Sequence, residues 1–160
     1  MKHISTILWM LLFIVVTSCE KEIIDEKDET FATAEIPAVD ESEKDDALTI
    51  AEAQLLENDT KVLIKAYIVA STTRSINNAD FEAPFEGSSA IVLADVPANS
   101  TRDNSMLFPV CLTDRKKARA ALNLVDNPQN WGHLIYIYGT KEKYMGRAGM
   151  KKVDNWEIIP

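Results

Sequence analysis

Hydrophobic and polar positions follow a helical spacing in one early segment of this 160-residue chain and a strand-like alternation in the next. In residues 48–59, "LTIAEAQLLEND", Ile50 and Ala53 share one helical face, and Thr49 with Glu52 matches a capping box. This segment predicts a short N-terminal helix. Residues 61–72, "KVLIKAYIVAST", alternate with a period of two, which predicts a strand. Its core face would carry Val62, Ile64, Ala66, Ile68 and Ala70, and its partly wet face Lys65, Tyr67 and Ser71.

Four further apolar runs predict the rest of a sheet. These runs are residues 90–96, 106–112, 133–144 and 148–159, and Pro109 in the second of them favours an edge or a bulge. Residues 75–89 are typical of a long loop. Residues 113–128 predict a helix that is capped by Thr113 or Asp114, ends at Asn127-Pro128 and buries Ala118, Ala121, Leu122 and Val125. The fold class expected from this order is mainly β: a five-stranded OB-like barrel with a helix between strands 3 and 4 and a short N-terminal helix.

The amino terminus predicts export and a lipid anchor. Lys2 and His3 precede an apolar run at 4–16, which is shorter than the roughly 20 residues of a membrane-spanning helix and typical of a secretory signal. The following "VTSC" resembles a bacterial lipobox, which implies cleavage before Cys19 and acylation of that residue. An ordinary signal peptide followed by a chance cysteine is the alternative interpretation.

Charge divides the remaining chain into a tail and a domain. Residues 20–46 hold 12 acidic and 3 basic side chains, whereas residues 47–160 hold 13 of each. We therefore expect a signal peptide at 1–18, the lipidated cysteine and an acidic disordered tether at 19–46, and one domain at 47–160. The start of the tether, "CEKE", resembles the surface-export tag of Bacteroidetes lipoproteins. That resemblance favours the cell surface over the periplasmic face of the outer membrane.

The domain also carries a family resemblance. "LNLVDNPQNWG" followed by "YGTKEKYMGRAGM", with "KAYIVAST" and "IVLAD" upstream, resembles the OB-fold-like domain of uncharacterised Bacteroidetes lipoproteins. The resemblance covers residues 47–158. This chain has Ala66 and Ala70 where the family strand usually has glycine, which bears on how closely a ligand could approach the backbone there. The resemblance implies the barrel and the envelope location but no activity.

No arrangement of residues predicts catalysis, a metal site or a cofactor. His133 is the single histidine of the expected mature protein, and Cys111 lies in an apolar run typical of a buried strand. Asp95, Asp103, Arg102 and Arg119 contain the residue types of a calcium-dependent nuclease site on an OB barrel, but in no recognisable motif, so we expect turn and cap roles. We therefore expect a protein that is not an enzyme.

Binding is the preferred function. Nine lysines and arginines lie between residues 115 and 152, and aromatic residues are interleaved with them. OB folds bind oligonucleotides or sugars on a face bordered by the loops joining strands 1–2 and 4–5. The ligand-binding residues expected on this basis are Tyr67, Phe81, Phe85, Arg119, Tyr136, Tyr138, Lys143, Tyr144 and Arg147.

Three alternatives remain open at this level. The aromatic residues could serve packing alone. The protein could be an accessory subunit of an outer-membrane complex, with an exposed apolar patch around Phe81, Phe85 and Val96. An oligonucleotide ligand is less favoured than a glycan, because the domain is neutral overall.

Overall fold

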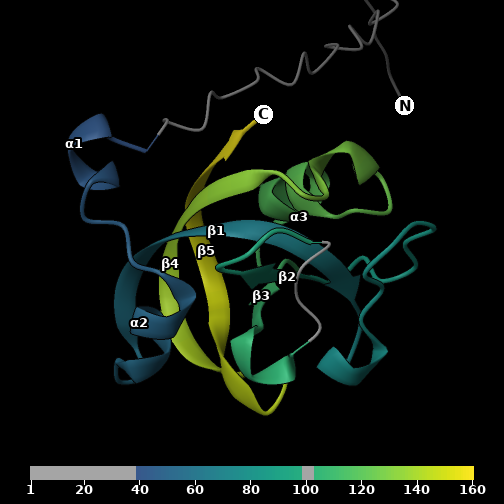
Figure 1. Cartoon of the computed structure of the whole chain (residues 1–160), viewed down its shortest axis with the longest axis horizontal. Coiled ribbons are helices and arrows are strands. Elements are labelled where there is room, and N and C mark those ends of the chain that lie inside the picture. The colour runs from purple at the N-terminus through teal and green to yellow at the C-terminus, as the bar shows by residue number, and fades with distance from the viewer. Residues whose placement is uncertain (1–38, 99–102) are drawn as a thin grey trace, which may run out of the picture. The chain divides into compact units, whose positions relative to one another are not determined.

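The chain forms a closed five-stranded barrel (Figure 1). The computed structural model describes residues 39–98 and 103–160. The strands are β1 (Thr60–Thr72), β2 (Ala90–Ala94), β3 (Phe108–Cys111), β4 (Leu134–Tyr144) and β5 (Arg147–Ile159). They are hydrogen-bonded in the order β1-β2-β3-β5-β4 and back to β1. All pairs are antiparallel except β3–β5, which meets in parallel at Val110 and Met150. The predicted OB-like fold class is confirmed.

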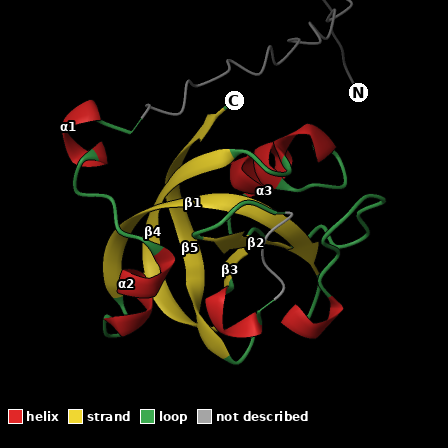
Figure 2. Cartoon of the chain, in the orientation of Figure 1, coloured by secondary structure: helices red, strands yellow, loops and turns green. Residues whose placement is uncertain are grey.

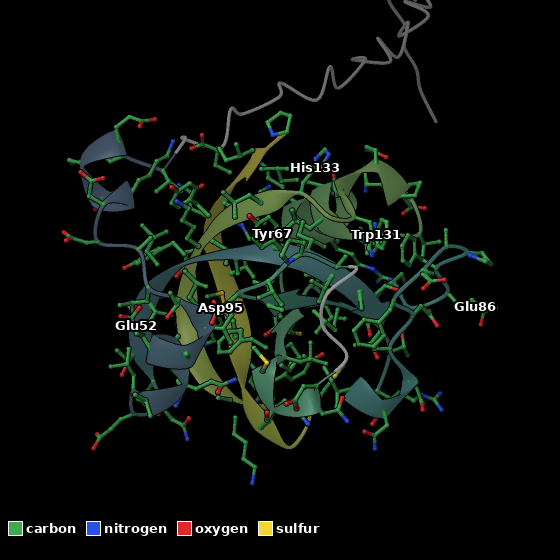
Figure 3. All side chains as sticks on the ribbon, viewed as in Figure 1. Glu52, Tyr67, Glu86, Asp95, Trp131 and His133 are labelled. Carbon is green, nitrogen blue, oxygen red and sulfur yellow. The ribbon has the colours of Figure 1, made fainter. Side chains whose placement is uncertain are left out.

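Short helices occupy the connections (Figure 2). They are α1 (Glu41–Lys44), α2 (Ile50–Leu55), η1 (Ile76–Asn78), η2 (Asn104–Met106), α3 (Lys116–Leu122) and η3 (Pro128–Asn130). The predicted capping box of α2 is confirmed, since Thr49 and Glu52 exchange both hydrogen bonds. The carboxylate of Asp95 also accepts from the backbone N–H groups of Ile50 and Ala51, at 2.6 and 3.1 Å. Figure 3 shows Glu52 on this helix and Asp95 beside it.

The helix between strands 3 and 4 is present as α3, but its details differ from the prediction. It begins after Arg115, whose side chain makes no capping hydrogen bond, so the predicted caps Thr113 and Asp114 are wrong. It ends at Leu122, with Asn123 as the C-cap. The side-chain amide of Asn123 donates to the backbone carbonyl of Arg119 and to the carboxylate of Asp126. The chain then turns, which buries Leu124 and leaves Val125 42% exposed instead of buried.

The end of the predicted disordered tether is ordered. Residues 39–46 lead into the barrel through α1, where Asp40 accepts a hydrogen bond from the backbone N–H of Ser42. Val39 is buried, and Lys44 forms an ion pair with Glu157 on β5. The sequence pattern misses these contacts because they join residues far apart in the chain. Residues 19–38 of the predicted tether, including Cys19, lie outside the described residues, as do the signal segment and Arg102.

The main core fills the barrel as the alternation predicts. Val62, Ile64, Ala66 and Ile68 of β1 all belong to it. The alternation breaks at a register shift between Ile68 and Ala70. Past this bulge both faces of β1 are buried. Ser71 is therefore buried, and its predicted position on a partly solvent-exposed face is wrong. Its backbone instead pairs with Asp80 in the following loop.

A second, smaller core lies on the other face of β1 and β2. It joins Val69, Ala70, Val92 and Ala94 of the strands to Ile76, Ala98 and Leu107 of the connections. Tyr67, Ala79, Phe81 and Trp131 pack against it in part. All five residues of β2 are therefore buried. The β1–β2 and β2–β3 connections cover this part of the sheet.

Candidate functional site

The face of strands 2 and 3, where OB folds bind their ligands, is not open in this protein. Val92 and Ala94 on β2 are fully buried under Ile76 and Leu107. Residues of the protein's own connections therefore take the place that a ligand occupies on an OB barrel with a bare face. A site in this domain must lie elsewhere.

The two loop phenylalanines are part of the packing. Phe85 is only 8% exposed and lies in the main core, with its ring centroid 6.4 Å from that of Trp131. Phe81 is half-buried against the second core. The expected exposed patch around Phe81, Phe85 and Val96 is therefore wrong, because Phe85 turns inward to close the end of the barrel. Neither ring is exposed enough for a ligand to stack on it.

Tyr136 and Tyr138 do share an outer face of the barrel, as expected. They lie on β4 opposite Lys65 and Leu63 of β1. Tyr138 is exposed and Tyr136 is half-buried. Tyr67 lies two residues beyond Lys65 on β1 and packs in part against the second core (Figure 3).

Lysines of the same chain lie over these rings. The Nζ atoms of Lys44 and Lys65 are 5.4 and 5.5 Å from the ring centroid of Tyr136, and that of Lys61 is 5.8 Å from Tyr138. Lys44 bonds to Glu157 at 2.8 Å and to Glu41 at 2.6 Å, and these bonds raise the pKa of Lys44 to about 12.

Lys61 in turn forms an ion pair with Asp154. Two of the three lysines over the rings are therefore neutralised by carboxylates of the same domain. Within the described residues, this surface supports the packing interpretation better than an open site.

The expected basic cluster is dispersed. Lys141 is buried and donates to the carbonyl oxygen of Leu56 at 2.5 Å. Arg115 donates to the backbone carbonyls of Val153 and Asp154 and lies over the ring of Trp156. The cluster thus holds the ends of strands and helices together.

The remaining expected ligand residues are similarly separated. Arg119 donates to the hydroxyl of Ser88 at 2.9 Å. Lys143 is exposed on the β4–β5 hairpin. Tyr144 lies beside Cys111, and its partial burial, followed by its hydrogen bond to that thiol, raises the pKa of the phenol. Cys111 itself is buried, as predicted.

The carboxylates considered for a nuclease site cap helices instead. Asp95 caps α2, and Asp103 accepts from both the backbone N–H and the hydroxyl of Ser105 at 2.8 Å. These bonds lower the pKa of Asp103. Among the residues that the structure describes, no group of three or more His, Cys, Asp or Glu side chains could hold a metal ion.

A polar groove lies in the connection between β1 and β2, a segment that carries no recognised sequence motif. It holds about 550 Å³, within the usual range of ligand pockets, and is lined by Thr73, Arg74, Asn78, Ala79, Asp80, Glu86 and Gly87. Arg74 and Glu86 are exposed, and neither side chain has a hydrogen bond or ion pair within the described part of the chain. Figure 3 shows Glu86 at the right of the view, on the connection between β1 and β2. We define these seven residues as the loop groove.

The loop groove is held in shape by the strand that precedes it. Ser71 and Asp80 exchange two backbone hydrogen bonds of 2.9 and 3.1 Å, and the carboxylate of Asp80 accepts from the backbone N–H of Glu86 at 3.0 Å. Gly87 passes so close to β1 that a Cβ there would lie 2.4 Å from the carbonyl carbon of Thr72. The glycine and the aspartate were the signals in the sequence that could have indicated this groove.

A family model decides what the domain is related to. The model, described as "Domain of unknown function (DUF6359)", matches residues 48–159, which is most of the chain. The chain belongs to this family. The DUF6359 match begins just before α2 and ends at the last residue of β5, so it spans the whole barrel.

Other comparisons add little to the DUF6359 assignment. A search of curated proteins finds no match. One solved structure, the hypothetical protein YgiW from E. coli, is 15% identical, with 71% of this chain and 89% of that chain covered and a TM-score of 0.42. At that TM-score, the OB-like assignment depends on this protein's own strand order. No helix among the described residues is long and apolar enough to cross a membrane.

Proposed function

We propose that this protein is a lipid-anchored envelope protein whose DUF6359 domain is a non-catalytic binding module for a glycan, held in the loop groove. The observation that carries this proposal is the groove itself. It offers Arg74, Asn78, Asp80 and Glu86 side by side. The backbone of Asp80 pairs with β1, and its carboxylate accepts from the backbone N–H of Glu86. Planar amide, carboxylate and guanidinium groups can form paired hydrogen bonds with neighbouring sugar hydroxyls.

The charge of the loop groove favours a neutral ligand over a nucleic acid. Asp80 and Glu86 together outweigh the single cation Arg74. A phosphate chain needs several lysines or arginines to replace its counterions, and its binding weakens steeply with salt. A neutral oligosaccharide has no such requirement, so its affinity should change little between low and high salt.

The envelope location is proposed from the sequence. The lipobox-like "VTSC" implies acylation of Cys19, and several acyl chains on one residue hold a protein stably on a membrane. The resemblance to Bacteroidetes lipoproteins favours the cell surface over the periplasmic face of the outer membrane. Mass spectrometry of the purified mature protein tests this: we expect an acylated Cys19 at the amino terminus, and a mature chain beginning elsewhere would refute it.

A glycan array tests the binding proposal. The full chain in detergent micelles should bind one class of neutral glycan at both low and high salt. Arg74→Gln and Glu86→Gln should each weaken that binding about tenfold, the loss expected for a hydrogen bond to a charged group. Glu57→Gln, an exposed acid outside the loop groove, is the matched control and should bind normally. Binding that survives both groove substitutions would place the ligand elsewhere.

An accessory subunit of an outer-membrane complex is the second candidate. One observation favours it: Leu55, at the end of α2, is 86% exposed, and Met106, on η2, is 41% exposed. Crosslinking of the tagged full chain in intact cells distinguishes the two candidates. A stoichiometric protein partner that is lost in Leu55→Ser, with glycan binding intact, would favour the accessory role.

A further inference from the structure

We propose that a second pocket, between α2, η2 and the start of β5, binds the C-terminal carboxylate of a peptide that ends in an apolar residue. This pocket holds about 380 Å³ and shares no lining residue with the loop groove. Its lining consists of Gln54, Ser105, Leu107, Arg147 and Ala148. We call it the Arg147 pocket.

The guanidinium of Arg147 has an unused donor. Its Nη1 atom donates to the backbone carbonyl of Asn104, whereas its Nε atom is buried and has no hydrogen-bond partner. Within residues 39–98 and 103–160, no carboxylate forms an ion pair with Arg147. A buried donor without an acceptor is unfavourable, and a carboxylate that bonds to Nε and the second Nη atom in parallel would remove that penalty.

A turn of the guanidinium is part of this proposal. Because Nε is closed to solvent, a carboxylate can reach it only after the guanidinium turns toward the pocket that it already lines. The hydrogen bond to Asn104 comes from the opposite edge of the group, so one edge can remain anchored while the other meets the ligand.

The remaining lining suits a peptide terminus better than a bare anion. Ala148 gives the pocket an apolar wall, with the buried Leu107 behind it, and the exposed Met106 lies in sequence between two lining residues. Gln54 uses its amide N–H to hold the carbonyl of Ser105 at 3.1 Å, which leaves its own carbonyl oxygen to accept from a peptide N–H. A peptide C-terminus presents a carboxylate, an apolar side chain and an amide N–H within one residue, which is the combination that this lining complements.

Nuclear magnetic resonance of the arginine Nε–H groups in the full chain, in detergent micelles, tests the assignment. The probes are the peptide Gly-Ser-Ala-Leu with a free carboxyl group and the same peptide with a C-terminal amide. The free acid should shift the Nε–H signal of Arg147 downfield, and the amide should bind at least about tenfold more weakly, as expected when a charged hydrogen bond is lost.

Two variants and a matched control complete the test. Arg147→Gln should abolish the preference for the free acid. Arg147→Lys should retain part of that preference, because lysine keeps the positive charge but lacks the two parallel N–H donors of the guanidinium. Lys117→Gln removes an exposed cation outside this pocket and should bind like the wild type. If Arg147→Gln does not fold, the Arg147→Lys result decides alone.

Several outcomes would overturn the proposal. These are equal binding of acid and amide, unchanged binding by Arg147→Lys and Arg147→Gln, or no shift of the Arg147 signal at millimolar peptide. A shift produced by decanoate but not by the peptide would also overturn it, since the occupant would then be a fatty acid. None of these results affects glycan binding in the loop groove, whose residues are different.

Discussion

The indole Nε1 of Trp131 donates a hydrogen bond of 3.0 Å to the backbone carbonyl of Val69. Val69 lies at the register shift of β1, where a bulge disrupts the ladder of strand hydrogen bonds. The same indole packs against both cores and against Phe85. One side chain therefore joins the segment between η3 and β4, the bulge of β1 and the loop that carries the loop groove.

Replacement of Trp131 with phenylalanine should lower the free energy of unfolding by about 1–2 kcal/mol, because the carbonyl of Val69 loses its donor and packing at two cores is reduced. Urea denaturation measures this change. Tyr138→Phe is the matched control: this exposed residue should change stability by no more than about 0.5 kcal/mol. Equal effects from both variants would show that the indole bond does not hold the bulge.

Gly87→Ala should be more destabilising than Gly146→Ala. At Gly87 the added Cβ would lie within 2.7 Å of three backbone atoms of Thr72, so the loop must move away from β1. At Gly146 nothing lies within 4 Å, and the penalty of about 1 kcal/mol comes from its φ of +85° alone. Thermal unfolding compares the stability of the two variants. Gly87→Ala should also weaken the binding of the ligand in the loop groove. A smaller effect at Gly87 would contradict the close approach.

Lys141→Met should lower the free energy of unfolding by about 1–3 kcal/mol. The buried ammonium of Lys141 bonds to the carbonyl of Leu56 and to the side chain of Asn58, and methionine leaves both acceptors without that donor. Lys143→Met, two residues further along β4 and exposed, should change stability by less than about 0.5 kcal/mol. Chemical denaturation of both variants would refute the structural role of Lys141 if their midpoints moved equally.

Glu52 should make the fold sensitive to acid. Its carboxylate accepts from the backbone N–H and the hydroxyl of Thr49, which lowers its pKa below the unfolded value of 4.5. A carboxyl with a lowered pKa in the folded state stabilises that state above pH 4.5, and the stabilisation disappears as the pH falls through the folded pKa. As the pH falls below 4.5, the melting temperature of Glu52→Gln should therefore fall less steeply than that of the wild-type protein. Parallel curves for both proteins would contradict this assignment.

The sequence predicts the barrel well because local patterns determine most of it. The alternation in β1 places Val62, Ile64 and Ala66 inside, and the capping box at Thr49 and Glu52 marks the start of α2. Cys111 is buried, as an apolar run implies. Each of these features depends on residues within a few positions of one another.

The candidate site is less predictable because long-range contacts decide it. Nothing in the neighbourhood of Phe85 indicates that it meets Trp131 across the barrel end, or that Lys141 bonds to Leu56. Past the bulge after Ile68 both faces of β1 are buried, and Ser71 pairs with Asp80 beside the loop groove. An exposed aromatic and a buried one look alike in a sequence when the partner comes from a distant segment.

The measurement that tests the central claim most directly is the affinity of the full chain for its array-selected glycan, compared between two double variants. Arg74→Gln with Glu86→Gln alters the loop groove, and Tyr136→Ala with Tyr138→Ala alters the outer face of β4. We expect loss of binding only in the first. Loss in the second, with binding intact in the first, would contradict the account and place the site on the tyrosine face of the barrel.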